Sequence, residues 1–104
     1  MKKVSDSKRY SIITDDLEHC IECGRTGINK HEIFFGTANR QLSKNYGLVI
    51  PLCDLYHHNQ FECKGIHFNK ELCEKWQKIG QKVFMEYYNK TEDEFRKIFG
   101  KSYI

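Results

Sequence analysis

The chain has 104 residues, of which 39% are hydrophobic, and a formal net charge of +3 at pH 7. This length suits one domain with a small core, and the sequence has neither an apolar run of membrane-spanning length nor the apolar segment of a signal peptide. The odd number of cysteines, five, indicates reduced thiols, so we expect a cytoplasmic protein rather than a secreted disulfide framework.

The first half of the chain predicts an arm followed by a β-hairpin. Residues 1–16 are polar and mixed in charge and predict an N-terminal arm, whereas residues 17–104 predict a single domain. Alternation over 28–35 and the apolar run 48–52 predict two strands. Residues 37–46, between them, predict a basic loop that could include a helical turn.

The last half of the chain predicts helices. A short polar helix is expected over residues 54–61. A longer helix is expected from an N-cap at Asn69 to about Tyr88. A last helix is expected to begin with a capping box at Thr91 and to end at Gly100. The core-facing stripe expected along the long helix is Leu72, Trp76, Ile79, Val83 and Tyr87.

Cysteine and histidine residues gather in two short clusters. The first is the Cys-x-x-Cys knuckle of Cys20 and Cys23, and the second begins at Cys53 and includes His57 and His58. Such short spacing lets both side chains of a pair reach one borderline metal ion such as zinc. Two clusters with a His-Glu pair between them predict two metals, one structural and one reactive.

These motifs, in this order, resemble the HNH (His-Me finger, ββα-metal) nuclease family, and within it small proteins encoded by phages and prophages. The segments that carry the resemblance are Cys20-x-x-Cys23-Gly24, residues 30–40, residues 43–53, His57-His58 and residues 65–69. The resemblance implies an α+β fold with a ββα-metal, treble-clef-like core, a zinc knuckle and a helical C-terminal third. It also implies a metal-dependent DNA endonuclease of low sequence specificity that uses one catalytic divalent metal, Mg²⁺ or Mn²⁺.

The resemblance assigns the reactive centre to the first strand and to later histidines. His31 and Glu32 match the pair at which one residue binds the metal and its neighbour acts as general base. Which of the two is the base stays open. His58 and His67 match the family's further metal ligands, and Arg40 and Lys44 are candidate contacts to the DNA phosphates.

The preferred structural zinc set is Cys20, Cys23, Cys53 and His57, with Cys63 as a substitute for His57. Cys73 lies on the stripe side of the long helix and is expected to pack as a small apolar residue.

The sequence departs from the family pattern at two places. Glu32 stands where the usual base is expected, and Leu48 stands about where an asparagine is usual. These departures keep an alternative open, a non-catalytic zinc module that binds DNA or a protein partner in a phage or recombination assembly. In either case a phage-encoded chain would act in the host cytoplasm.

Overall fold

The structure is a computed structural model that describes residues 3–53 and 70–104. Its elements, in chain order, are η1 (Asp6–Lys8), β1 (Ile28–Glu32), α1 (Asn39–Tyr46), β2 (Val49–Cys53), α2 (Lys70–Tyr87) and α3 (Glu92–Phe99). The predicted α+β class is confirmed. The short helix predicted over 54–61 and the N-cap predicted at Asn69 lie outside the described residues.

The two strands form an antiparallel hairpin whose register runs from Ile28 opposite Cys53 to Glu32 opposite Val49. The second strand was predicted to within one residue, but the first ends three residues earlier than expected. After Glu32 the ladder continues with a bond from the Ile33 amide to the carbonyl oxygen of Leu48, and the chain then turns toward α1. One end of the hairpin therefore carries Cys53, and the opposite end carries Glu32.

The basic loop predicted over 37–46 is largely the helix α1, which corrects the sequence-based expectation. Its buried Ser43 explains the difference, because the Ser43 hydroxyl donates to the carbonyl oxygen of Phe34 at 2.7 Å and accepts from its amide at 3.0 Å. This tertiary contact fixes the helix beside the end of β1. The helix ends at Gly47, whose φ of +72° is the left-handed conformation that glycine adopts easily.

The helix α2 was predicted in the right place, and Leu72, Trp76 and Ile79 of the expected stripe lie in or against the core, but the end of the stripe does not. Tyr87, included in the expected stripe, is 64% exposed. The buried positions of α2 are Trp76, Gly80, Gln81 and Phe84. At Gly80 an added Cβ would lie 3.1 Å from a methyl carbon of Ile33, so this glycine lets the helix approach the end of β1 closely. The predicted core role of Trp76 is confirmed.

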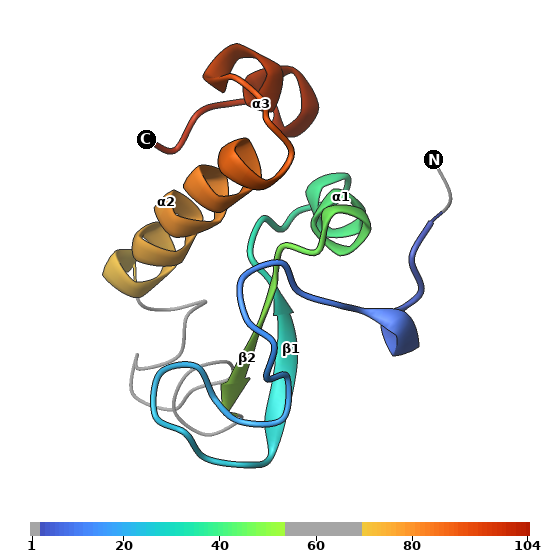
Figure 1. Ribbon diagram of the computed structural model, residues 1–104, viewed down its shortest axis with the longest axis vertical. Coiled ribbons are helices and arrows are strands. Elements are labelled where there is room, and N and C mark those ends of the chain that lie inside the picture. Colours follow the sequence, from blue (N-terminus) through green and yellow to red (C-terminus); the bar gives the residue numbers. More distant parts are fainter. Residues whose placement is uncertain (1–2, 54–69) are drawn as a thin grey trace.

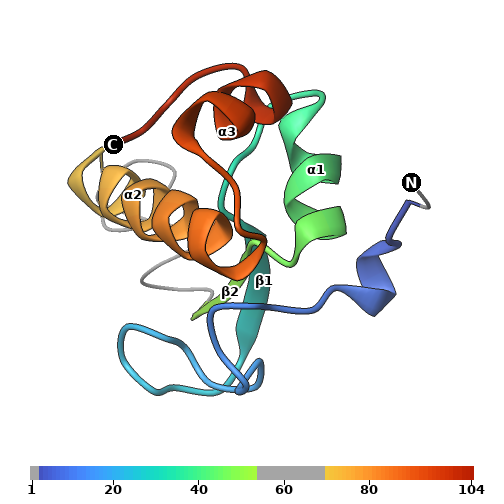
Figure 2. The same ribbon diagram turned by 45° about the horizontal axis from the view of Figure 1, so that its top comes forward.

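Aromatic rings hold the helices together. The ring of Phe34 lies 5.3 Å from that of Phe95 and 4.9 Å from that of Phe99, and Phe84 lies 5.4 Å from Phe95, all between centroids. The capping box predicted at Thr91 is present and starts α3. In Figures 1 and 2 the three helices surround the upper end of the hairpin, with α2 and α1 on opposite sides of it.

The N-terminal arm, described from residue 3, lies along α1 and continues past the hairpin (Figure 1). The amide of Ile12 donates to the carbonyl oxygen of Gly47 at 2.9 Å, and the Tyr10 hydroxyl donates to that of Asn45 at 2.6 Å. An added Cβ at Gly47 would collide with the Tyr10 ring, so the ring packs directly on this glycine. These contacts place Arg9 next to β1.

Candidate functional site

A group of three cysteines lies at the Cys53 end of the hairpin. The knuckle is a tight turn in which the amide of Cys20 donates to the carbonyl oxygen of Arg25 and the amide of Gly24 donates to that of Cys20, both at 2.8 Å. The amide of Ile21 donates to the carbonyl oxygen of Pro51 at 2.9 Å and so ties the turn to β2. Because of this tie, both knuckle cysteines lie beside Cys53.

The sulfur atoms of the three cysteines suit a tetrahedral metal site. The Sγ atoms of Cys20, Cys23 and Cys53 all lie within 4.8 Å of one another, and that of Cys23 is 3.7 Å from that of Cys53. Zinc–thiolate bonds of about 2.3 Å in a tetrahedron place their sulfurs about 3.8 Å apart. The spacing fits three thiolate ligands on one ion, so this group could hold a metal ion, as the sequence predicted.

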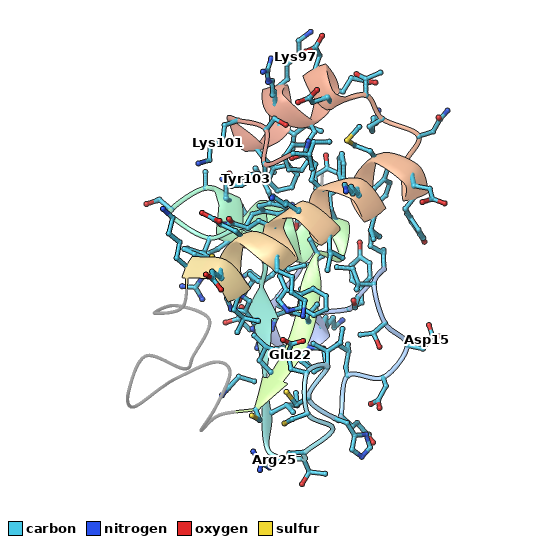
Figure 3. The ribbon with its side chains drawn as sticks, turned by 90° about the vertical axis from the view of Figure 1, so that its left-hand side faces the viewer. Asp15, Glu22, Arg25, Lys97, Lys101 and Tyr103 are labelled. Atoms are coloured by element: carbon cyan, nitrogen blue, oxygen red, sulfur yellow. The ribbon has the colours of Figure 1, made fainter. Side chains whose placement is uncertain are left out.

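The electrostatic surroundings of the knuckle favour the thiolate form, which is the form that binds metal. The backbone amide of Arg25 donates to the Cys23 sulfur and, with the thiols of Cys20 and Cys53, lowers the Cys23 pKa below its ordinary value. Cys20 and Cys53 are buried, while Cys23 is exposed. Glu22, beside the knuckle, forms a 2.8 Å ion pair with Lys75 of α2. Figure 3 shows Glu22 and Arg25 toward the lower end of the hairpin.

The predicted fourth ligand, His57, and its substitute Cys63 both lie outside the described residues. Cys73 is not part of the cluster. It is half-buried against the core, and this burial raises the pKa of its thiol. The prediction that Cys73 packs as an apolar residue is confirmed.

The His31–Glu32 pair lies at the other end of the hairpin. Both residues are buried, His31 with 2% and Glu32 with 6% of the residue exposed. Adjacent strand positions point to opposite faces of a sheet, so the two side chains leave β1 on different sides. His31 is paired with Ile50 of β2, and its ring centroid is 6.0 Å from that of Phe35.

Two arginines contact the Glu32 carboxylate. Nη1 of Arg9 lies 3.3 Å from Oε1 of Glu32, and Nη2 of Arg40 lies 3.8 Å from the same oxygen. The guanidinium of Arg9 also donates to the carbonyl oxygen of Lys30 at 2.6 Å. Arg40 was predicted from the sequence as a phosphate contact, whereas no role was predicted for Arg9. No local signal identifies Arg9, because its contact with Glu32 spans 23 positions of the chain.

Arg40 and Lys44 differ in their surroundings although both belong to α1. The Arg40 side chain is 60% exposed, whereas that of Lys44 is 13% exposed and its Nζ lies 2.7 Å from Oδ1 of Asp6. The Lys44 ammonium, through this hydrogen bond and its charge, holds the pKa of Asp6 below its usual range. Arg40 therefore presents its charge to solvent, and Lys44 fastens the N-terminal arm.

The predicted reactive metal site is only partly within the described residues. His31 is described, but His58 and His67 are not. In residues 3–53 and 70–104 the cysteine group is the one cluster of three potential metal ligands. The described helices include none that is long and apolar enough to cross a membrane.

Comparisons of this chain with models of known protein families, with curated proteins and with solved structures found no match.

Proposed function

We propose that this chain is a metal-dependent DNA endonuclease of the HNH type, braced by a structural zinc ion. The observation that carries the proposal is the organisation of the hairpin. A three-cysteine group anchors one end, and a buried His-Glu pair at the other end lies next to the exposed guanidinium of Arg40. A strand-borne imidazole and carboxylate beside a solvent-facing cation can supply the general base and the phosphate contact of phosphodiester hydrolysis.

Each of these residues has a chemical task in the proposed reaction. His31 or Glu32 would accept the proton of the attacking water, and the other, with His58 and His67, would hold a divalent metal. Such a metal would supply Lewis-acid stabilisation of the phosphate and of the departing 3′-oxygen. Arg40 binds a phosphate oxygen of the DNA, since its guanidinium is both charged and exposed.

Zinc in the cysteine group stabilises the fold rather than taking part in the reaction. Three thiolates and a fourth protein ligand would close its coordination shell, as in structural zinc sites, and leave no position for water. In a domain of this size the binding free energy of the metal becomes folding free energy. The Cys-anchored end would then hold β1 and β2 in the register that presents His31 and Glu32.

One observation favours a second candidate, a non-catalytic zinc module that binds DNA or a protein partner. The Glu32 carboxylate is already engaged by Arg9 at 3.3 Å, with Arg40 nearby, and two cations around one acid are also typical of a purely structural ion pair. In such a module the hairpin would serve only as a scaffold, and zinc would be the single metal required.

Cleavage of supercoiled plasmid separates the two candidates. We expect the zinc-loaded wild-type chain to nick plasmid in Mg²⁺ or Mn²⁺ but not in EDTA, and a folded His31→Ala variant to be inactive. Absence of cleavage with all divalent metals tested, from a folded protein with bound zinc, would contradict the nuclease and leave the binding module. Binding of that inactive protein to DNA with a steep salt dependence would then favour DNA over protein as the partner.

A further inference from the structure

The N-terminal arm reaches the His31–Glu32 end of the hairpin through the side chain of Arg9. Its Nη1 donates to the carbonyl oxygen of Lys30 at 2.6 Å and contacts Oε1 of Glu32 at 3.3 Å, while its Nε donates to the carbonyl oxygen of Asp6 at 2.9 Å. One guanidinium therefore joins the arm, the backbone of β1 and the buried carboxylate. The rigid fork of arginine can meet several acceptors at once, which a lysine ammonium on a flexible stem does not reproduce.

We propose that Arg9 is a positioning residue that holds the Glu32 carboxylate in its reactive orientation, an inference that rests on the proposed nuclease function. The Glu32 side chain is 7% exposed and that of Arg9 is 22% exposed, so the pair is largely shielded from water. A shielded carboxylate needs a charged or hydrogen-bonding partner in place of the water it has lost, and such a partner also fixes its orientation. Arg9 provides that partner from a segment outside the hairpin.

The oxygen of Glu32 that the two arginines contact bears on whether they position the carboxylate or block it. Arg9 and Arg40 both contact Oε1 of Glu32. These contacts of the two guanidinium groups therefore converge on one oxygen of the carboxylate. A carboxylate has two oxygens, so a carboxylate held at Oε1 can still accept a proton or bind a cation in the proposed reaction, whichever role Glu32 has.

The arm is fastened at other points, so the contribution of Arg9 can be tested separately from docking of the arm. Lys44 pairs with Asp6 at 2.7 Å, the amide of Val4 donates to Oδ1 of Asn45 at 2.9 Å, and Tyr10 packs on Gly47. Shortening Arg9 leaves these contacts in place. The exposed neighbour Lys8 is the matched control, because Lys8→Ala removes one positive charge from the same segment, as Arg9→Ala does.

The test compares the full-length, zinc-loaded wild-type chain with Arg9→Ala, Arg9→Lys and Lys8→Ala in plasmid nicking with Mn²⁺. We expect Arg9→Ala to lower kcat by about tenfold or more with KM for DNA within about twofold, because misplaced reactive groups slow chemistry rather than binding. Arg9→Lys should recover only part of this loss, and Lys8→Ala should retain nearly the wild-type rate. A raised KM with unchanged kcat in Arg9→Ala would make Arg9 a DNA contact and overturn the inference.

A second measurement is independent of activity. The losses of thermal stability in Arg9→Ala and Glu32→Gln should be non-additive, with the double variant losing less than the sum of the two single variants, because the two residues share one contact. Additive shifts in melting temperature would overturn the inference. If wild type cleaved plasmid and Arg9→Ala cleaved it at the same rate, the positioning role would be overturned while the proposed nuclease function would stand. A wild-type chain that cuts no DNA would remove the proposed function and the positioning role together.

Discussion

The two ends of the hairpin differ in what holds their candidate functional side chains in place. At one end Cys20, Cys23 and Cys53 are alike in chemistry, and their sulfurs converge within 4.8 Å. At the other end His31 and Glu32 differ in chemistry, leave the strand on opposite faces and are buried among groups from other segments. The first end has the geometry of a metal site in itself, whereas the second depends on what surrounds it.

This difference follows from the range of the contacts that build each end. The knuckle is closed by backbone hydrogen bonds within residues 20–25 and is joined to β2 by one more, between Ile21 and Pro51. The surroundings of Glu32 come from Arg9 in the arm and Arg40 in α1. We therefore expect substitutions at the cysteine end to act on folding, and substitutions at the other end to act on function with smaller changes in stability.

Removal of one cysteine ligand should have the largest effect on the molecule. Structural zinc contributes about 10–16 kcal/mol to folding in small zinc-dependent domains, which is as large as the total stability of most proteins. We expect Cys20→Ser to lose zinc and to unfold or melt far below the wild-type protein, as measured by metal analysis and circular dichroism. The matched control is Cys73→Ser, which changes a thiol outside the cluster and should keep its zinc. A folded, zinc-loaded Cys20→Ser protein would contradict the assigned site.

The opposite behaviour is expected for His31→Ala. The variant should keep its zinc and its fold but lose plasmid nicking by roughly 10²–10⁴-fold, the usual contribution of a general base or an equally essential group. Nicking rate and melting temperature, measured on the same preparation, check both halves of this expectation. An unfolded His31→Ala protein would show that this end of the hairpin also serves folding, and the contrast between the two ends would fail.

The same contrast explains which features could be predicted from the sequence. The knuckle, the strand 48–52 and the capping box at Thr91 depend on neighbouring residues, and the structure agrees with each of them. The helix α1 was missed because Ser43 is stabilised there by the backbone of Phe34, nine positions away. Arg9 was missed for the same reason.

The buried face of α2 shows a further limit of sequence patterns. Apolar spacing favoured a stripe that includes Tyr87, but the helix leaves Tyr87 exposed and buries Gly80 and Gln81. A glycine and a glutamine carry little hydrophobic signal. Gly80 is needed for close approach to Ile33, and Gln81 bonds the C-terminal residues Ser102 and Tyr103. Both requirements arise from tertiary contacts that the periodicity of one helix cannot reveal.

The reactivity of Cys73 reports whether the cysteine end supports the whole fold. Burial raises the Cys73 pKa, so at a fixed pH less thiolate is present than in an unfolded chain, and alkylation should be several-fold slower. Its rate against pH should have a midpoint above that of an ordinary thiol. Because the unfolded chain ionises this thiol first, the folded state should lose stability as pH rises through the ordinary thiol pKa.

Removal of zinc with a chelator should abolish this protection of Cys73, although the residue lies outside the cluster. Peptide mapping after alkylation with iodoacetamide gives the rate at Cys73 alone. A rate that stays slow after zinc has been removed would show that α2 remains packed without the metal. Zinc would then stabilise only the residues around the knuckle, and the cysteine end would not support the fold of the whole domain.

The smallest effect is expected within α1, where it distinguishes two cations of the same helix. If the proposed function holds, Arg40→Ala should weaken DNA binding several-fold and reduce the slope of log affinity against log salt concentration by about 1, because it would remove one exposed contact to a phosphate. Lys44→Ala should leave that slope nearly unchanged, since the Lys44 amine is already engaged by Asp6 and its side chain is 13% exposed. Fluorescence anisotropy with a labelled duplex in EDTA measures both variants without cleavage. An equal loss of slope in both variants would mean that DNA displaces Asp6 from Lys44, and the N-terminal arm would then have to move when substrate binds.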